Sequence, residues 1–363
     1  MIRITKRRVA WFAFGVLVLA SVVYLVRAAS ILAAYKAKML CSEVFLAGRE
    51  ADVVERELEV DDLAPLRYIA KSVNRGDRRV TARVAGVIRQ DATYRDSRGC
   101  AVRVESDTAV DSVRHLERRP AASADVSPDP RLGAVLDRAF AEQNQERPRR
   151  TRAVVVVRDG RIVAERYAPG FTKDTPILGW SMTKTMINAL VGILVKEGRL
   201  AVDRPAPIPE WQDAGDPRRA ITLDHLLRMS SGLEFDESPW NPVSDVTVML
   251  LGRPDAGLYV NDGVWEEERI LPEGWVTYTR SPAPADPLTR YGAHVWLKVA
   301  DEYSGNAVLP ADAFHATGHA GQFVTMIPSA RLVVVRLGLT RYPHAWDQTA
   351  FVRDVLDAIG GMQ

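Results

Sequence analysis

The chain has 363 residues, of which 47% are hydrophobic and 26% are charged, and these proportions are ordinary for a folded protein. Its 48 lysines and arginines nearly balance 46 aspartates and glutamates, so the net charge of +2 does not indicate a nucleic-acid-binding surface. The sequence contains no G-x-G-x-x-G motif, no phosphate-binding loop and no metal-spaced set of cysteines and histidines, so we expect neither a cofactor nor a metal.

A long apolar run begins close to the N-terminus. Four of the first eight residues are basic, and an uncharged stretch of eighteen residues, 9–26, follows them. This length is about the lower limit for a membrane-spanning helix. The basic flank predicts residues 1–8 as a cytoplasmic tail and residues 9–29 as a single-pass anchor in the inner (cytoplasmic) membrane. The rest of the chain would then lie on the periplasmic or extracellular side. A cleaved signal peptide ending near residues 28–30 is the alternative.

The two cysteines, Cys41 and Cys100, both follow the apolar run. In an oxidising compartment they can pair and stabilise the fold, whereas in the cytosol both would be buried thiols. Leu40 stands where a lipid-modified cysteine would need a small residue, so we favour the disulfide over a lipoprotein anchor.

Residues 30–125 are expected to form an N-terminal extension and linker. Strand-like runs such as 79–88 occur in this region, and a stretch rich in serine, proline and aspartate at 123–130 is typical of a linker. The remaining residues, 126–363, are long enough for one domain with its own core.

The pattern of residues 126–363 predicts an α+β domain, an antiparallel sheet flanked by helices. A helix is expected over 132–140, followed by a hairpin over 153–167 with an Asp-Gly turn. Near the C-terminus, two strands joined at 328–330 precede a helix over 346–359 that has one apolar face.

Ser181 and Lys184 lie at the start of another predicted helix, whose apolar residues recur at helical spacing up to a Lys-Glu-Gly stop signal at 196–198. Positions i and i+3 of a helix are neighbours, so the lysine amine can lie beside the serine hydroxyl. A serine needs such an adjacent group to become a good nucleophile, and the helix N-terminus favours developing negative charge. The pattern also occurs by chance in long helices. Further polar groups near the helix start are expected to line the site: Thr183, Thr185 and Asn188.

From about residue 152 onward, the chain resembles the serine β-lactamase-related family. This branch contains class C β-lactamases, penicillin-binding-protein-like proteins, esterases and 6-aminohexanoate-dimer hydrolases. Four segments in the same order carry the resemblance: 153–167, the Ser-x-x-Lys helix with 197–203, 221–233, and 318–337. The resemblance implies a β-lactamase/transpeptidase-like fold and a serine hydrolase that forms an acyl-enzyme.

His319-Ala320-Gly321 occupies the place of the family's third motif, which is usually Lys-Thr-Gly and often His-x-Gly in esterase-like branches. The resemblance implies that a strand N–H near Gly321 and an N–H near Ser181 form the oxyanion hole. His319, Gly321 and Gln322 are then the expected substrate-binding residues, with Gly321 allowing close approach of the acyl group. Because this motif has His319 in place of the usual lysine, the resemblance points to small esters or amides rather than β-lactams as substrates. His315 is expected to be structural.

The family's catalytic tyrosine has no clear counterpart here. The literal match, Tyr259-Val260-Asn261, lies in a stretch that resembles a later, structural segment of the family, whereas 250–256 resembles a stretch well before the tyrosine. The simplest account is that an internal segment is missing near residue 256, which would impair proton transfer and expose part of the core. The alternative is that Tyr259 acts by a changed route.

We therefore expect a membrane-anchored serine hydrolase with Ser181 as nucleophile and Lys184 as its base, acting on small ester or amide substrates. The alternative is an impaired pseudo-enzyme that binds acyl donors or cell-wall peptides, and a structural envelope protein is a more distant one. Trp180 and Trp240 are candidates for an apolar acyl pocket and equally for the core. The sequence does not indicate an oligomeric state.

Overall fold

The structure is a computed structural model that describes residues 6–95, 99–102, 129–238, 241, 243–252, 271–298, 309–342 and 344–360. The chain divides into two compact units. The first combines Met1–Glu117 with Glu234–Tyr259, and the second combines Arg118–Leu233 with Val260–Gln363. The boundary expected near residue 126 lies outside the described residues. The grouping of Glu234–Tyr259 with the N-terminal part was not anticipated from the sequence.

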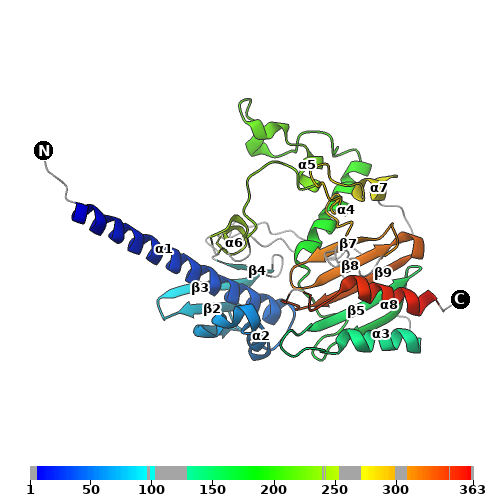
Figure 1. The fold of residues 1–363 in the computed structure, drawn as a ribbon, viewed down its shortest axis with the longest axis horizontal. Coiled ribbons are helices and arrows are strands. Elements are labelled where there is room, and N and C mark those ends of the chain that lie inside the picture. The colour runs from blue at the N-terminus through cyan, green and yellow to red at the C-terminus, as the bar shows by residue number, and fades with distance from the viewer. Residues whose placement is uncertain are drawn as a thin grey trace. The chain divides into compact units, whose positions relative to one another are not determined.

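Helix α1 (Lys6–Cys41) begins the first unit and has two different halves. The side chains of residues 11–26 are exposed although most are large and apolar, and this half extends beyond strands β2 and β3 (Figure 1). In the second half, Ala33, Ala37 and Leu40 are completely buried. By length and composition, Trp11–Leu46 is apolar enough to cross a membrane.

The second half of α1 packs on a four-stranded antiparallel sheet with the strand order β1-β2-β3-β4. Short helical segments connect α1 to the sheet, and two more lie after residue 243. The elements are η1 (Ser42–Leu46), α2 (Ala51–Leu58), η2 (Asp61–Tyr68), β1 (Ile69–Asn74), β2 (Arg79–Val84), β3 (Ile88–Arg95), β4 (Gly99–Val102), α6 (Asp245–Thr247) and η6 (Val248–Gly252).

A buried lysine ties α1 to the segments after it. Lys36 is almost fully buried, and its Nζ lies 2.7 Å from a Glu55 carboxylate oxygen and 2.6 Å from one of Glu59. It also donates to the carbonyls of Leu66 and Ile69. A buried charge is tolerated when it is paired and hydrogen-bonded in this way. Two residues later, Lys38 donates to Leu250 O at 3.0 Å, which links η6 to α1 within the same unit.

The cysteine pairing predicted from the sequence is confirmed. Cys41, the last residue of α1, forms a disulfide with Cys100 on β4, and their Cα atoms are 6.0 Å apart. The bond joins the end of the apolar helix to the last strand of its sheet.

The second unit contains a five-stranded antiparallel sheet with the order β6-β5-β9-β8-β7. Its helices and strands are α3 (Pro130–Phe140), β5 (Thr151–Arg158), β6 (Arg161–Tyr167), η3 (Trp180–Met182), α4 (Thr183–Lys196), η4 (Pro209–Trp211), η5 (Pro217–Ala220), α5 (Leu223–Leu227), α7 (Trp275–Thr279), β7 (Phe314–Gly318), β8 (Gln322–Ile327), η8 (Pro328–Ala330), β9 (Leu332–Gly338) and α8 (Gln348–Gly360). The structure confirms the predicted α+β class, the β5–β6 hairpin, and the helices expected over 132–140 and 346–359, which are α3 and α8.

Local sequence explains these elements. The β5–β6 hairpin turns at Asp159 and Gly160, which have φ values of 54° and 74°, as a tight hairpin turn requires. Helix α3 begins with Pro130 after Asp129, whose side chain accepts a hydrogen bond from Arg131 N. Helices α3 and α8 bury their apolar faces against one face of the sheet (Figure 1).

Removing the disulfide should destabilise the first unit. The bridge closes a loop with a sequence separation of 59. In the chain-entropy model, such a loop contributes about 4 kcal/mol to the free energy of unfolding. We expect the Cys41→Ser/Cys100→Ser variant of the full chain to unfold at markedly lower urea concentration than wild type.

Reductant supplies the control for this experiment. Dithiothreitol should lower the wild-type midpoint toward that of the double variant and leave the variant unchanged. Equal midpoints for oxidised wild type and the variant would contradict the prediction.

Candidate functional site

Ser181 and Lys184 meet at the junction of η3 and α4. The Lys184 Nζ lies 3.1 Å from Ser181 Oγ and donates a hydrogen bond to it. Ser181 is exposed and Lys184 is half-buried, so the hydroxyl faces solvent while the lysine stem packs against the protein. The i, i+3 spacing seen in the sequence therefore produces a nucleophile beside a potential base.

The backbone before Ser181 is held in an unusual conformation. Trp180 has a φ of 51°, which is uncommon for a bulky residue and costs free energy unless its surroundings hold it. Two hydrogen bonds do so: Met182 N donates to Gly179 O at 3.2 Å, and Thr183 Oγ1 donates to Trp180 O at 2.8 Å. This turn places Ser181 two residues before α4 begins at Thr183.

His294, which sequence reasoning missed, braces the first turn of α4. Its Nδ1 lies 2.8 Å from Lys184 O, and because a carbonyl only accepts, Nδ1 carries the proton and donates. In return, Thr185 Oγ1 donates to His294 O at 2.8 Å. Burial lowers the pKa of His294 to about 4, so the ring is neutral at pH 7. The contact joins residues about 110 positions apart, so no local sequence motif predicts it.

Asn188 supports the helix from inside rather than lining an open site. It is buried, and its Oδ1 accepts hydrogen bonds from Trp275 Nε1 and Thr279 Oγ1, both at 3.1 Å. A Cβ atom on Gly192, one turn later, would lie 2.6 Å from the Trp275 indole nitrogen, so only glycine fits there. The polar groups expected to line the site are thus bonded within the protein, since Thr183 and Thr185 also bind backbone carbonyls.

The predicted third motif lies beside the nucleophile turn. His319, Ala320 and Gly321 form the tight turn between β7 and β8, in which Gly318 pairs with Gln322. A Cβ atom on Gly318 would lie 2.2 Å from Gly179 O, so the backbones of the two segments touch. The exposed His319 ring meets the Trp180 ring edge-on, with centroids 5.2 Å apart.

The structure gives Gly321 and Gln322 different surroundings from those expected. A Cβ atom on Gly321 would lie 2.5 Å from Arg336 Nη1, so this glycine makes room for an interior guanidinium. Gln322 is 1% exposed and its amide binds backbone groups of the protein. Since a glutamine within a strand gives no local signal of burial, the sequence did not show that its side chain points inward. His315 is fully buried on β7 and bonded to Thr325.

Lys184 is the one side chain within hydrogen-bond distance of Ser181 Oγ in the described ranges. The sequence also offered Tyr259 as a candidate for proton transfer and Trp240 as a candidate for acyl binding, and both lie outside the described residues. Met186 and Leu190 on α4 are each more than 40% exposed. The internal deletion expected near residue 256 lies outside the described residues and stays a prediction. Among the residues described, no group of three His, Cys, Asp or Glu side chains could hold a metal.

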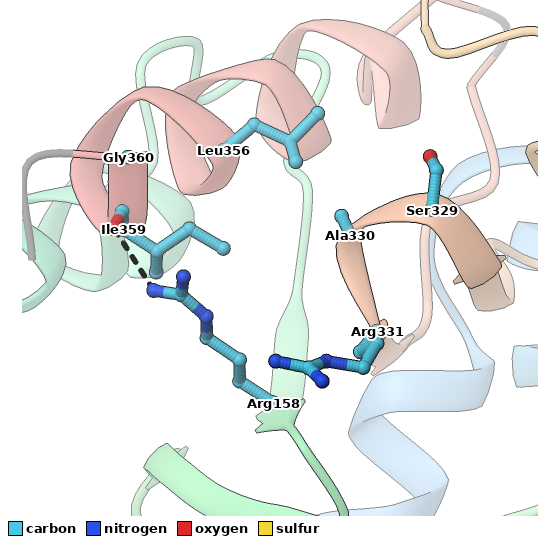
Figure 2. A pocket seen from close by; sticks show the side chains of 7 residues that line it. All are labelled: Arg158, Ser329, Ala330, Arg331, Leu356, Ile359 and Gly360. Carbon is cyan, nitrogen blue, oxygen red and sulfur yellow. Dashed lines mark hydrogen bonds between the residues drawn. The ribbon is translucent and has the colours of Figure 1, made fainter. Parts of the chain in front are cut away.

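A separate hollow lies beside the β8–β9 connection, at the opposite end of β8 from the His319–Gly321 turn. Figure 2 shows the side chains that line it. There Arg158 Nη1 donates to Ile359 O at 3.0 Å, while Ser329 Oγ donates to Asp312 Oδ1 at 2.8 Å. Its serine is bound to a carboxylate rather than to a lysine or histidine, so the Ser181–Lys184 pair remains the better candidate for acyl chemistry. The lining residues are Arg158, Ser329, Ala330, Arg331, Leu356, Ile359 and Gly360.

Part of the chain is similar in sequence to known proteins. A family model described as beta-lactamase matches residues 136–254. A 6-aminohexanoate-dimer hydrolase of Paenarthrobacter ureafaciens is 30% identical over 131 residues, 36% of this chain and 32% of that protein. The matched segment therefore spans about a third of that relative's length.

Solved structures also resemble the chain at low identity. EstA from Arthrobacter nitroguajacolicus has 13% identity and a TM-score of 0.46, covering 66% of this chain and 99% of that one. A class C beta lactamase from Rhodobacter sphaeroides has 16% identity and a TM-score of 0.38, covering 64% and 98%.

The buried His294 should make stability depend on pH. Because its pKa falls from 6.5 to about 4 on folding, the unfolded chain binds more protons between these values. Its contribution is complete above pH 6.5 and is lost as the pH falls toward 4, by about 3 kcal/mol in total. We expect the free energy of unfolding to fall less steeply over pH 7–4.5 in His294→Gln than in wild type.

The exposed His344 provides a matched control for this measurement. His344→Gln should keep the wild-type pH dependence. An unchanged slope in His294→Gln would show that the ring is not held neutral.

Proposed function

Because the chain belongs to the serine β-lactamase-related family, with its α+β fold, we propose that it is a membrane-anchored serine hydrolase that acts on small esters or amides. The observation that supports this most directly is the 3.1 Å contact between Lys184 Nζ and Ser181 Oγ. The relative named for hydrolysis of a 6-aminohexanoate dimer supports amides as one substrate class.

In the proposed reaction, Ser181 Oγ attacks the carbonyl carbon of the substrate while the amine form of Lys184 accepts the hydroxyl proton. Backbone N–H groups near Ser181 and in the His319–Gly321 turn stabilise the oxyanion. Lys184 then donates the proton to the departing alcohol or amine, which leaves an ester on Ser181. A water molecule, deprotonated by Lys184, attacks this ester and releases the acid, restoring the serine hydroxyl.

A catalytically impaired binding protein is the second candidate. The observation that favours it is that, in the described part of the chain, only Lys184 reaches Ser181, with no tyrosine beside them. Such a protein would still bind acyl donors or cell-wall peptides, and would acylate slowly without turnover.

Covalent labelling should distinguish these two functions. A fluorophosphonate should add to Ser181 of the detergent-solubilised full chain with loss of fluoride, and Ser181→Ala should abolish the adduct. Lys184→Met should slow labelling by about 10²–10⁴-fold, the usual value of positioned proton transfer. Intact mass gives the adduct, and release of nitrophenol from p-nitrophenyl acetate gives turnover.

Lys196→Met, in the last turn of the same helix, is the matched control and should label at the wild-type rate. Labelling by the fluorophosphonate or by a fluorescent penicillin without turnover would favour the binding protein. The Tyr259→Phe variant would then test whether Tyr259 takes part in the reaction. Absence of an adduct from folded, monomeric protein would refute the hydrolase.

The exposed apolar half of α1 supports the proposed membrane anchor. Leu17 is 66% exposed and Val18 is 46% exposed, although both are apolar. A charged residue near the centre of a spanning helix costs about 2.5–3.5 kcal/mol. We expect Leu17→Arg/Val18→Arg to shift the protein from the alkali-resistant membrane fraction to the soluble fraction.

Val87→Arg is the control, because Val87 is an exposed apolar residue outside α1. This variant should stay in the membrane fraction. Mass spectrometry of the wild-type protein decides between an anchor and a cleaved signal, since only the anchor keeps residues 9–29.

A further inference from the structure

The turn between β7 and β8 has a backbone that needs support. Ala320 and Gly321 both have positive φ values, 60° and 80°, and this conformation is costly for an alanine. The turn also joins β7, whose last residue touches the nucleophile segment, to β8 in the interior of the sheet. Something in the structure must therefore hold these two residues in place.

Gln322 supplies the first part of that support. Its Nε2 lies 3.1 Å from His319 O, 3.0 Å from Ala320 O and 2.7 Å from Gly338 O. Its Oε1 accepts a hydrogen bond from Gly338 N at 3.1 Å. The buried amide thus ties two carbonyls of the turn to the end of β9, and Thr340 N adds a second donor to Ala320 O.

Arg336 supplies the second part. Its side chain is fully buried, and Nη1 donates to Gly321 O at 2.6 Å. Nη2 is bonded to Arg149 O, Thr151 Oγ1 and Thr340 Oγ1, and the guanidinium lies over the Trp346 ring. Within the described part of the chain, its hydrogen-bond acceptors are carbonyl and hydroxyl oxygens and include no carboxylate.

The burial of Arg336 is energetically unfavourable, which argues that this side chain does more than fill space in the core. Burying a guanidinium costs free energy, and an ion pair would be the usual compensation. Here burial lowers the pKa of Arg336 to about 9, which leaves it protonated at pH 7. A Cβ atom at Gly321 or Gly338 would lie 2.5 Å from its guanidinium, so two glycines make room for the cation.

The orientation of the turn follows from these contacts. Gln322 and Arg336 together bind the carbonyls of His319, Ala320 and Gly321. A trans peptide places its C=O and N–H on opposite sides, and the described residues contain no cis peptide. The N–H groups of Ala320 and Gly321 therefore face away from the Gln322 amide, and the N–H of Gln322 faces away from the Arg336 guanidinium. Successive N–H groups of this kind can bind an anion.

We propose that Gln322 and Arg336 are positioning residues that hold the His319–Gly321 turn so that its N–H groups face the oxyanion formed at Ser181, an inference that rests on the proposed function. The contact of Gly318 with Gly179 O and the His319–Trp180 ring contact place the turn beside the nucleophile. Neither residue touches the substrate: both act through the backbone of the turn.

The test uses Arg336→Met, Gln322→Met and the conservative Arg336→Lys in the full chain. Loss of an oxyanion-hole donor costs about 10²–10³-fold in rate. Because the other side chain still holds the turn, we expect each Met variant to lose about 10–100-fold in fluorophosphonate labelling rate. With p-nitrophenyl acetate, kcat should fall while KM stays near the wild-type value. Arg336→Lys should lie between wild type and Arg336→Met, since one ammonium can still reach Gly321 O.

Val334→Ala is the matched control, because Val334 is fully buried two residues earlier on the same strand. It should lower thermal stability and leave labelling within about twofold of wild type. All rates are compared below the melting temperature of every variant. Should Arg336→Met not fold, Gln322→Met and Arg336→Lys carry the same comparison.

A second readout does not depend on catalysis. The NMR signals of the His319 ring and the Trp180 indole report their edge-on contact, and they should shift in the Met variants and not in Val334→Ala. Wild-type labelling rates in folded Met variants, or unshifted signals, would overturn the proposal. Shifted signals in a protein whose wild type never labels would refute the hydrolase and leave the positioning of the turn supported.

Discussion

The close approach of Gly318 to the Gly179 carbonyl is the constraint on which the candidate site depends. A Cβ atom on Gly318 would lie 2.2 Å from that oxygen, so any other residue would push the two backbones apart. Ser181 and Lys184 form a local pair, but a pair alone offers only a nucleophile and a base. The contact adds the backbone of the β7–β8 turn, which in the proposed reaction stabilises the charge of the acyl-transfer intermediate.

Both sides of this contact are held by buried polar groups rather than by apolar packing alone. On the nucleophile side, His294 binds the first turn of α4, and Asn188, which lies on α4, accepts hydrogen bonds from Trp275 and Thr279. On the turn side, Gln322 and Arg336 bind the carbonyls of residues 319–321. Hydrogen bonds have directions, so such networks fix the orientation of a peptide group in a way that aliphatic side chains do not. Precise placement of this kind matters most where charge develops during a reaction.

Much of the architecture was visible in the sequence because it follows from short-range rules. The Asp159-Gly160 hairpin, α3, α8 and the Ser181–Lys184 neighbours depend on contacts within a few residues. The Cys41–Cys100 pair was predictable because only two cysteines exist. In contrast, the hydrogen bond from His294 to Lys184 O has no local signature, because the two residues are about 110 positions apart.

The sequence by itself determined the elements, the candidate nucleophile and its neighbouring lysine, since helical spacing and turn chemistry act locally. Only the tertiary structure decided what surrounds them. Gly321 was expected to make room for an acyl group, yet it makes room for the Arg336 guanidinium, and Gln322 points inward rather than toward substrate. Whether a polar side chain faces the interior depends on the groups that strands from elsewhere in the chain bring to it, and those pairings follow from the fold as a whole.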